Sequence, residues 1–399
     1  MGKAQGPAMD IGLNDREVDI ETIVNNSEGE GPDMGFKLND LTADIEEGVK
    51  SFSLCDEEKK WTATSIYKVP SFIRDIRKDI FTPTVVSFGP YHHNAHNLRP
   101  VEEHKRRALV HFLRMASKPL DHFIEAMRAI EKQLQDSTIA STRMLRMKDE
   151  KCRAKRLPYI RRDMLVMENQ LPLLVLKKLL EVEGLQSDVD DVSINKMVLR
   201  FFEVEKYIPI TGLGLHPLDV YRKSLLHGTP QRTPPRAARN QSSNEVIRPA
   251  VELHEAGIKF KKGESLADID FRKGVLTLPF LQVDDDTESM LLNLVAFEHL
   301  HVGTGSEVIS YVCFMDEVID SAKDVRLLHG KGIIRNASGS DKSVAELFGR
   351  LSKEVTLGPE RRLQDVRRLV NEHCGARWNT WKADLRHNIS IPHGPRSHS

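Results

Sequence analysis

The stretch ENQLPLLVLKKLLEVEG, from Glu168 to Gly184, contains the most clearly marked element of the chain, a predicted helix over residues 172–183. Pro172 suits the first position of a helix, where its missing N–H would have no partner, and Gly184 suits the position just past the end. The residues between them place leucine on nearly every side of the helix. A helix that is apolar all round is usually buried. We therefore expect this helix to lie in the centre of the core.

On both sides of this stretch, the apolar spacing predicts more helices than strands. Two helices are expected before it, over residues 101–115 and 120–134. Those expected after it cover residues 251–257, 285–299, 307–322 and 364–385, and one more begins at Ser343. Extended segments are expected at residues 66–70 and 84–90 and in two pieces around Gly274, within 269–283. The predicted fold class is mainly α, a helical globular domain with a few short β-strands.

Three segments are expected to lie outside the packed domain. Residues 1–60 are acidic and rich in Gly and Asn, and they have too little apolar surface to offset the entropy cost of ordering. We predict that they are disordered. Residues 227–249 collect Gly, Pro, Gln and Ser, a composition typical of a flexible linker. Residues 389–399 are predicted to form a disordered tail, which leaves one domain over residues 61–388.

The composition argues against several classes of protein. The 58 basic and 58 acidic residues cancel, so no global field attracts nucleic acid. The four cysteines form no Cys-x-x-Cys pair and show no zinc spacing, which argues against a disulfide scaffold. No stretch approaches the roughly 20 apolar residues of a membrane-spanning helix. We expect no specific nucleic-acid partner and no cofactor.

Most catalytic motifs are missing from the sequence. It has no phosphate-binding Gly-x-x-x-x-Gly-Lys-Ser/Thr loop, no Gly-x-Ser-x-Gly and no His-Glu-x-x-His. His92, His93 and His96 are candidate metal ligands, but no nearby Cys or carboxylate completes a tetrahedral set. We favour a polar surface turn after Gly89 and Pro90 over a metal site, and we expect no catalytic residue.

Two polar segments each allow a functional and a structural interpretation. Glu168 is either a general acid–base or, with Asn169 and Gln170, a partner for the free N–H groups where the helix starts at Pro172. We favour the second. The basic stretch 143–162 is either a site for the phosphates of nucleic acid or lipid, or a solvated linker. We favour the linker, because Tyr159 is the only aromatic residue among these bases.

A series of ordered motifs runs from about Trp61 to Asn388. The first two are Ile66-Tyr67-Lys68-Val69-Pro70 and Val85-Val86-Ser87-Phe88-Gly89-Pro90-Tyr91-His92-His93. The others are Pro100-x-Glu102-Glu103-His104-Lys105, Asp163-Met164-Leu165-x-x-Glu168-Asn169-Gln170-Leu171-Pro172, His216-x-Leu218-Asp219, Glu252-Leu253-x-Glu255-Ala256-Gly257, Asn293-Leu294-x-Ala296-Phe297-Glu298 and Arg377-Trp378-Asn379. Together they resemble the plant family of domain of unknown function 247. The resemblance implies structural roles for Pro70, Gly89, Pro90, Glu102, His104, Glu168, Asn169, Gln170, Gly257 and Trp378.

The sequence departs from the family pattern in two places. The family usually carries a helical segment with an Asp-Gly-Cys-Phe core before the Glu-Asn-Gln motif, and the basic residues 143–157 stand in its place. Family members usually end in a hydrophobic membrane anchor, whereas this chain ends in a polar stretch that begins at Ile389. The chain thus resembles a shortened member that lacks the anchor.

The resemblance implies a recognition or signalling role and no reaction, since the family has no established enzymatic activity. Some grass members are implicated in pollen–stigma self-recognition. We expect a non-enzymatic plant interaction or signalling protein with unknown protein partners, located in the cytoplasm or at the periphery of a membrane. Members of the family are usually anchored in a membrane at the C-terminus. Two alternatives stay open. One is an unrecognised enzyme with a site around His92, His93, His104 and Glu168, and the other is a peripheral membrane-binding module that uses the basic stretch.

Overall fold

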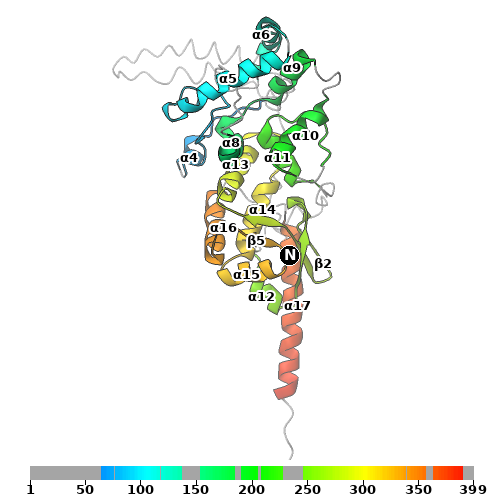
Figure 1. Cartoon of the computed structure of the whole chain (residues 1–399). Helices are drawn as coiled ribbons and strands as arrows, with labels where there is room; N and C mark the ends of the chain where they lie inside the picture. Colours follow the sequence, from blue (N-terminus) through cyan, green and yellow to red (C-terminus); the bar gives the residue numbers. More distant parts are fainter. Residues whose placement is uncertain are drawn as a thin grey trace, which may run out of the picture. The chain divides into compact units, whose positions relative to one another are not determined.

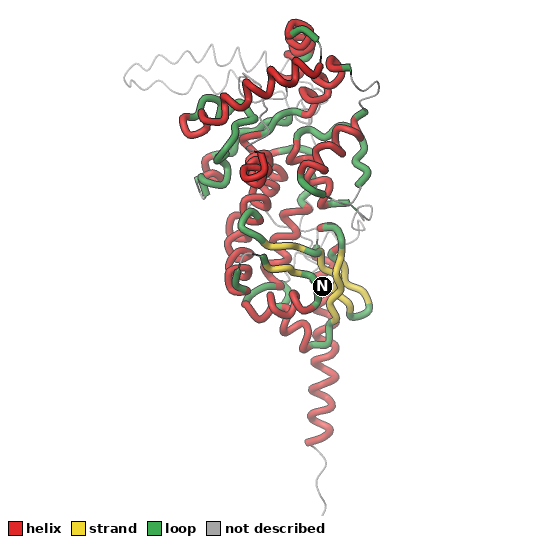
Figure 2. The backbone as a smooth tube through the Cα atoms, viewed as in Figure 1, coloured by secondary structure: helices red, strands yellow, loops and turns green. Residues whose placement is uncertain are grey.

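The computed structural model describes residues 64–75, 77–116, 118–136, 153–184, 190–204, 208–227, 246–337, 339–355 and 363–389. Helices dominate these residues, and short strands lie among them (Figure 2). The expected mainly α class with a few short strands is confirmed. Residues 1–60, nearly all of the predicted tail and most of the predicted linker lie outside the described residues.

The first half of the described chain is a succession of helices joined by irregular segments (Figure 1). In chain order these are α4 (Ser71–Arg74), the 3-10 turn η1 (His96–Leu98), α5 (Arg99–Ala116), α6 (Leu120–Ala129), α7 (Glu131–Asp136), α8 (Arg153–Met164), the 3-10 turn η2 (Met167–Asn169), α9 (Leu173–Glu183), α10 (Asp191–Phe201) and α11 (Pro217–Leu225). Two expectations need correction here. The helix predicted over residues 120–134 divides at Ile130 into α6 and α7. The basic stretch is not a linker from Arg153 onward, because α8 begins there.

Helix α9 has the predicted bounds but does not lie in the centre of the main core. Gly184, at φ 70°, closes it in the left-handed conformation that the sequence predicts. Its buried residues are Leu173 and Val175, and Leu173 belongs to a smaller apolar cluster shared with α10 and α11. The expectation of a central helix is wrong because Lys177 and Lys178 need a surface position, where they pair with acidic side chains.

The main core is built by the helices of the second half, with α13 at its centre. These helices are α12 (Ala250–Glu255), α13 (Thr287–Leu300), α14 (Glu307–Val318), α15 (Ala322–Gly330), α16 (Asp341–Val355) and α17 (Gln364–Ile389). Helices α14 and α15 pack against α16, and α13 packs against α14 (Figure 1). Every residue of α13 from Leu291 to Glu298 is buried. A helix surrounded on all sides shows no one-sided apolar stripe.

The helix predicted over residues 307–322 is in fact two helices. Helix α14 ends at Val318, and α15 begins after Ser321, which forms a capping box with Asp324. The two boundaries come from cap chemistry that the apolar spacing alone does not reveal.

The spacing Asp285-x-x-Glu288 at the start of the predicted helix 285–299 is typical of a capping box, but no capping box forms there. Helix α13 begins at Thr287 and has no side-chain cap. Glu288 instead pairs with Arg77 at 2.9 Å and with Arg350 of α16 at 3.1 Å. It therefore joins α13 to the N-terminal segment and to α16.

The strands of the described residues make two small sheets. In the first, β1 (Lys259–Gly263), β3 (Val275–Pro279) and β2 (Asp270–Arg272) lie in that order, with β1 parallel and β2 antiparallel to β3. In the second, β4 (Leu281–Val283) pairs in parallel with β5 (Ile334–Asn336). Gly274, at φ 76°, makes the turn between β2 and β3, so the two extended pieces predicted around it are confirmed. The segment 84–90, expected to be a strand, contains none.

One apolar cluster joins residues from both sides of the predicted linker. Tyr67 and Leu218 come before the linker and share this core with Leu253 and Leu276, which follow it. Ile247, inside the predicted linker, is 4% exposed and donates its N–H to Glu317. The segment 227–249 therefore does not separate two cores, and Ile247 near its end is packed into the protein, whereas Val246 and Arg248 are exposed. None of the helices in the described ranges combines the length and apolar composition needed to cross a membrane.

Candidate functional site

Residues 163–170, which we call the clasp segment, hold the irregular segment 84–92 through polar side chains. Asp163, at the end of α8, is fully buried. Its carboxylate accepts the N–H groups of Thr84, Val85 and Val86 at 2.6–2.8 Å and the Thr84 hydroxyl at 3.1 Å. Charge-assisted bonds of this kind offset the cost of burying a carboxylate.

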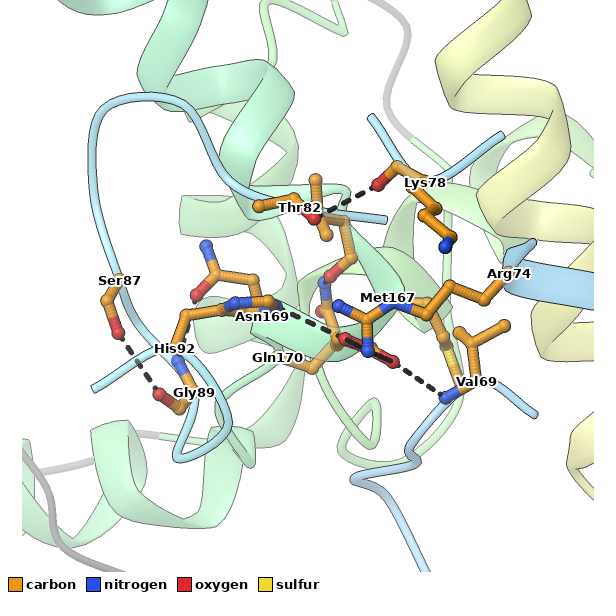
Figure 3. Close-up of polar contacts among 12 residues, drawn as sticks. Val69, Arg74, Lys78, Thr82, Ser87, Gly89, His92, Met167, Asn169 and Gln170 are labelled. Carbon is orange, nitrogen blue, oxygen red and sulfur yellow. Dashed lines mark hydrogen bonds and ion pairs between the residues drawn. The ribbon is translucent and has the colours of Figure 1, made fainter. Parts of the chain in front are cut away.

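Asn169 uses its full hydrogen-bonding capacity on the same segment. Its Oδ1 accepts the N–H groups of Phe88 at 2.7 Å and Gly89 at 3.1 Å (Figure 3). Its Nδ2 donates to the carbonyl oxygens of Val86 and Asp163, both at 2.9 Å. An amide side chain has two acceptor sites and two hydrogens, so each is occupied by backbone.

Gln170 and Gly89 complete the contact between the two segments. Nε2 of Gln170 donates to the carbonyl oxygens of Met164 and Val166, and Oε1 accepts the N–H of Leu218 at 3.1 Å. A Cβ at Gly89 would lie 2.8 Å from the carbonyl oxygen of Gln170. The closeness of the two backbones explains the glycine.

Asn293 of α13 ties this arrangement to the main core. Its Oδ1 accepts the N–H of Met167 at 2.7 Å, and its Nδ2 donates to the carbonyl oxygen of Ile80 at 3.3 Å. One buried side chain thus bonds to the clasp segment and to the N-terminal segment together.

Glu168, Asn169 and Gln170 were expected to bond to the free N–H groups at the start of the helix after Pro172. This expectation is wrong. The start of α9 has no side-chain cap. Gln170 does support a helix start, but that of α11, where Leu218 lies in the first turn. Each of the three side chains also accepts an N–H group far away in the sequence, from Val69 for Glu168, Phe88 for Asn169 and Leu218 for Gln170.

Glu168 is the second buried charge of the clasp segment, with 1% of its surface exposed. Oε1 accepts the N–H of Val69 at 3.1 Å, and the guanidinium of Arg74 lies 3.2–3.3 Å from both oxygens (Figure 3). Nε2 of His92 is 3.3 Å from Oε2, within ion-pairing distance but outside hydrogen-bond geometry. Burial and the charge of Glu168 raise the pKa of Tyr91, whose buried hydroxyl bonds to none of the described residues.

The structure brings together only part of the predicted His/Glu site. His92 contacts Glu168, whereas His93 and His96 are exposed. Among the described residues, no three metal-ligating side chains gather into a possible ion site. His104 lies on α5 and is half-buried.

The other motif residues lie at turns and helix ends. Pro70 is the N-cap of α4, Pro90 lies in the turn before His92, and Glu102 pairs with Lys105 at 2.5 Å on α5. Gly257 follows α12 at φ 86°, where glycine is favoured. Trp378 lies in α17, but its side chain is outside the described part.

Two of the basic residues in the stretch 143–162 are engaged with the protein itself. Arg161 donates to the carbonyl oxygen of Phe201 at 2.7 Å and pairs with Glu203 at 2.6 Å. Arg162 lies 3.8 Å from Asp286. These two side chains are therefore not free to collect phosphates, and residues 143–152 lie outside the described part.

A second buried polar cluster, the Arg222 triad, was not recognised from the sequence. Arg222 of α11 contacts Glu298 of α13 at 2.7–2.8 Å and Glu307 of α14 at 2.5 Å, and all three side chains are buried. Glu298 also accepts the N–H groups of Val308 and Ile309 at the start of α14. Burial raises the pKa of Glu298, and the Arg222 charge opposes this rise. Glu298 stands in a recognised motif, whereas Arg222 and Glu307 lie outside the motifs quoted from the sequence.

Four rings, those of His216, Phe297, His301 and Tyr67, lie beside the triad. His216 caps α11 by accepting the N–H of Asp219 at Nδ1, and burial lowers its pKa to about 3. His216 is fully buried, with its ring edge-on to Phe297, which stacks on His301. The Tyr67 hydroxyl is 2.7 Å from Nδ1 of His301 and 3.0 Å from the carbonyl oxygen of Thr64. Burial lowers the pKa of His301 as well, so both imidazoles are held in the neutral form.

Comparisons with known proteins agree with the motif pattern. The model of a family described as plant protein of unknown function, domain of unknown function 247, matches residues 66–153 and 136–391. The UPF0481 protein At3g47200 of Arabidopsis thaliana is 27% identical over 387 residues, covering 81% of this chain and 79% of the relative. The putative UPF0481 protein At3g02645 of the same plant is 33% identical over 139 residues, covering 34% of this chain and 26% of the relative. No solved structure matches the chain. Since the family model covers most of its length, the chain belongs to the plant family of domain of unknown function 247.

Proposed function

We propose that this chain is a non-enzymatic interaction protein that binds a protein partner through exposed apolar side chains of α5 and α6. The observation that carries the proposal is the exposure of Met115, Leu120 and Ile124, at 58%, 37% and 38%. Large apolar side chains that gather at a protein surface are typical of binding sites.

The three side chains are close together in the chain and belong to packed helices. Leu120 and Ile124 are four residues apart and so lie on one face of α6, and Met115 is in the last turn of α5. Phe123, on another face of α6, packs edge-on against Phe112 of α5, with ring centroids 5.3 Å apart. Helix α6 also packs against α9. The apolar surface therefore rests on a supported helix.

The use of the clasp segment supports a non-enzymatic role. Asp163, Asn169 and Gln170 direct their polar atoms to backbone groups of the chain itself. The four acceptor sites of Asp163, the whole amide of Asn169 and both amide hydrogens of Gln170 are occupied in this way, so these groups stabilise the fold.

The test is cross-linking of the tagged full chain in plant cells, comparing wild type with Leu120→Glu/Ile124→Glu. We expect a cross-linked partner with the wild-type chain and its loss in the variant. The matched control is Val192→Glu/Met197→Glu, which changes two apolar residues of α10 at 37% and 36% exposure. Thermal unfolding checks that both variants fold. A partner that survives in the Leu120→Glu/Ile124→Glu variant, or no partner at all, contradicts the proposal.

A second candidate, an unrecognised enzyme, is favoured by one observation, the 3.3 Å contact between His92 and Glu168. The pair lies just outside hydrogen-bond geometry, so proton exchange between the carboxylate and the imidazole needs a small shift of the two side chains. The His92→Gln variant separates the two candidates. An interaction protein keeps its cross-linked partner in this variant, whereas an enzyme that needs the imidazole loses turnover of whatever plant metabolite the wild-type chain consumes from a tissue extract.

A further inference from the structure

The strand β1 lies at the edge of its sheet. The sheet order is β1–β3–β2, so among the described residues β1 pairs with β3 on one side and has no strand on the other. An edge strand presents a row of unpaired N–H and C=O groups, onto which another extended segment can add.

The register shows which backbone groups are free. The N–H of Lys259 donates to Gly274, and the carbonyl oxygen of Gly263 accepts from Phe280. In a parallel ladder alternate residues face the neighbour, so Lys259, Lys261 and Gly263 face β3. Phe260 and Lys262 turn their N–H groups to the outer edge, where these donate to none of the described residues.

The exposed side chains of β1 are all lysines. Lys259, Lys261 and Lys262 are exposed, whereas Phe260 is half-buried and packs against the main core. Lys259 and Lys261 lie on the outer face of the sheet, opposite Val275 and Thr277. Neither has a carboxylate partner within the described part of the chain.

This charge pattern selects the strand that the edge can accept. A second copy of β1 would place lysine beside lysine, and like charges directly opposite each other destabilise a pair of strands. An acidic strand would instead place a carboxylate beside each lysine, and each such pair contributes roughly 0.2–1 kcal/mol. The lysines of β1 therefore disfavour pairing with a second copy of β1 and favour pairing with an acidic strand.

We propose that β1 binds an extended acidic segment of a partner protein, which adds to the sheet as a fourth strand. The N–H groups of Phe260 and Lys262 donate to its carbonyl oxygens, and Lys259 and Lys261 pair with its alternate carboxylates. This inference rests on the proposed interaction function and names one class of partner. It uses a surface distinct from that of Met115, Leu120 and Ile124.

The probe is a fluorescent ten-residue peptide of alternating Glu and Val, titrated against the full chain. We expect saturable binding that weakens as salt is added. Lys259→Glu/Lys261→Glu is expected to weaken binding roughly tenfold, since it replaces two attractions with two repulsions. The matched control, Lys323→Glu/Lys331→Glu, changes two exposed lysines at α15 and is expected to leave binding within about twofold.

Backbone pairing is tested separately from charge. N-methylation of alternate amides removes the peptide's donors on one edge only. We expect one methylation register to abolish binding and the other to preserve it. Hydrogen exchange at the amides of Phe260 and Lys262 is expected to slow when the peptide binds.

Three outcomes overturn the inference: no binding of the peptide, equal binding by both methylated forms, or an equal loss in the α15 control. These results leave the proposed function intact if cross-linking in plant cells still depends on Leu120 and Ile124. If the peptide binds but no partner is cross-linked, the results contradict the proposed binding surface on α5 and α6 and support the proposed strand addition at β1.

Discussion

At the scale of single residues, the side chains of the clasp segment accept backbone N–H groups that would bond to a neighbouring strand in a sheet. The N–H groups from Thr84 to Gly89 need acceptors because this segment is packed. Asp163 supplies them for Thr84, Val85 and Val86, and Asn169 supplies them for Phe88 and Gly89. This explains why an extended, valine-rich segment that predicted a strand is not one.

The approach of the two backbones at Gly89 leads to a stability prediction. Gly89→Ala would force a Cβ to within 2.8 Å of the Gln170 carbonyl oxygen, and we expect a loss of about 1–3 kcal/mol. Gly375→Ala is the matched control, because nothing lies within 4 Å of its Cβ position in α17. There we expect a gain of about 0.5–1 kcal/mol from helix propensity. Urea unfolding of both variants measures the difference, and equal stabilities would contradict the close approach.

The buried imidazole of His216 predicts acid sensitivity. The pKa of His216 falls from 6.5 to about 3 on folding. Below pH 6.5 the unfolded chain takes up a proton on this group while the folded chain does not, so the free energy of unfolding decreases as the pH falls. Between pH 6.5 and 5 the loss from this group is about 2 kcal/mol.

The variant His216→Asn isolates this contribution. Asparagine keeps an acceptor at the N-cap of α11 and has no titrating ring. We expect urea unfolding at pH 7.5, 6.5 and 5 to show a flatter pH dependence than the wild-type chain, by about 2 kcal/mol over the acid range. The remaining slope includes His301 and His299, whose pKa values burial also lowers. An unchanged slope would show that His216 is not the responsible group.

At the scale of helices and strands, local signals in the sequence predicted where a helix begins and ends better than where that helix lies in the fold. Pro172 and Gly184 marked α9 correctly because both act through their own backbone. The burial of α9 was misjudged because leucine spacing does not show what packs against a helix. The contacts of Asp163 with residues 84–86 join segments nearly 80 residues apart in the chain, and no local pattern encodes such a pairing.

The Arg222 triad joins three helices and predicts a large loss when its cation is removed. Arg222→Met leaves the carboxylates of Glu298 and Glu307 buried without their counter-charge, and we expect destabilisation of about 3–5 kcal/mol. The matched control is Arg326→Met, which removes an exposed arginine 3.5 Å from Asp341 and costs less than about 1 kcal/mol. Thermal unfolding compares the two. Similar losses in both variants would argue against a special role for the triad.

At the scale of the whole molecule, the main core contains residues from both sides of the linker that composition predicts at residues 227–249. Tyr67, Val69 and Leu218 lie in one apolar cluster with residues of α12, α13 and the first sheet. Glycine and proline content predicts where a chain is hard to order, but it does not predict whether the flanking parts share a core. The parts of the chain on either side of the predicted linker therefore share one core.

Cleavage within the predicted linker, residues 227–249, is expected to leave the two fragments bound to each other. We expect a chain with a protease site placed among residues 231–240 to remain one particle after cleavage, since apolar burial holds the two fragments together. Size-exclusion chromatography of the cleaved chain, with and without denaturant, measures this. Separation of the fragments in native buffer would mean that the shared core is not enough to hold them.

Asn293 has a consequence for how the protein is made. Its amide reaches back to Ile80, 213 residues earlier in the chain. At a synthesis rate of roughly 5–20 residues per second, the ribosome takes about 10–40 s to reach this asparagine after Ile80 has been added. During that interval Tyr67, Val69 and Phe81 have no core in which to be buried. The growing chain is thus a candidate client for chaperones that shield apolar segments at the ribosome exit, and slower translation before residue 293 lengthens its period of exposure.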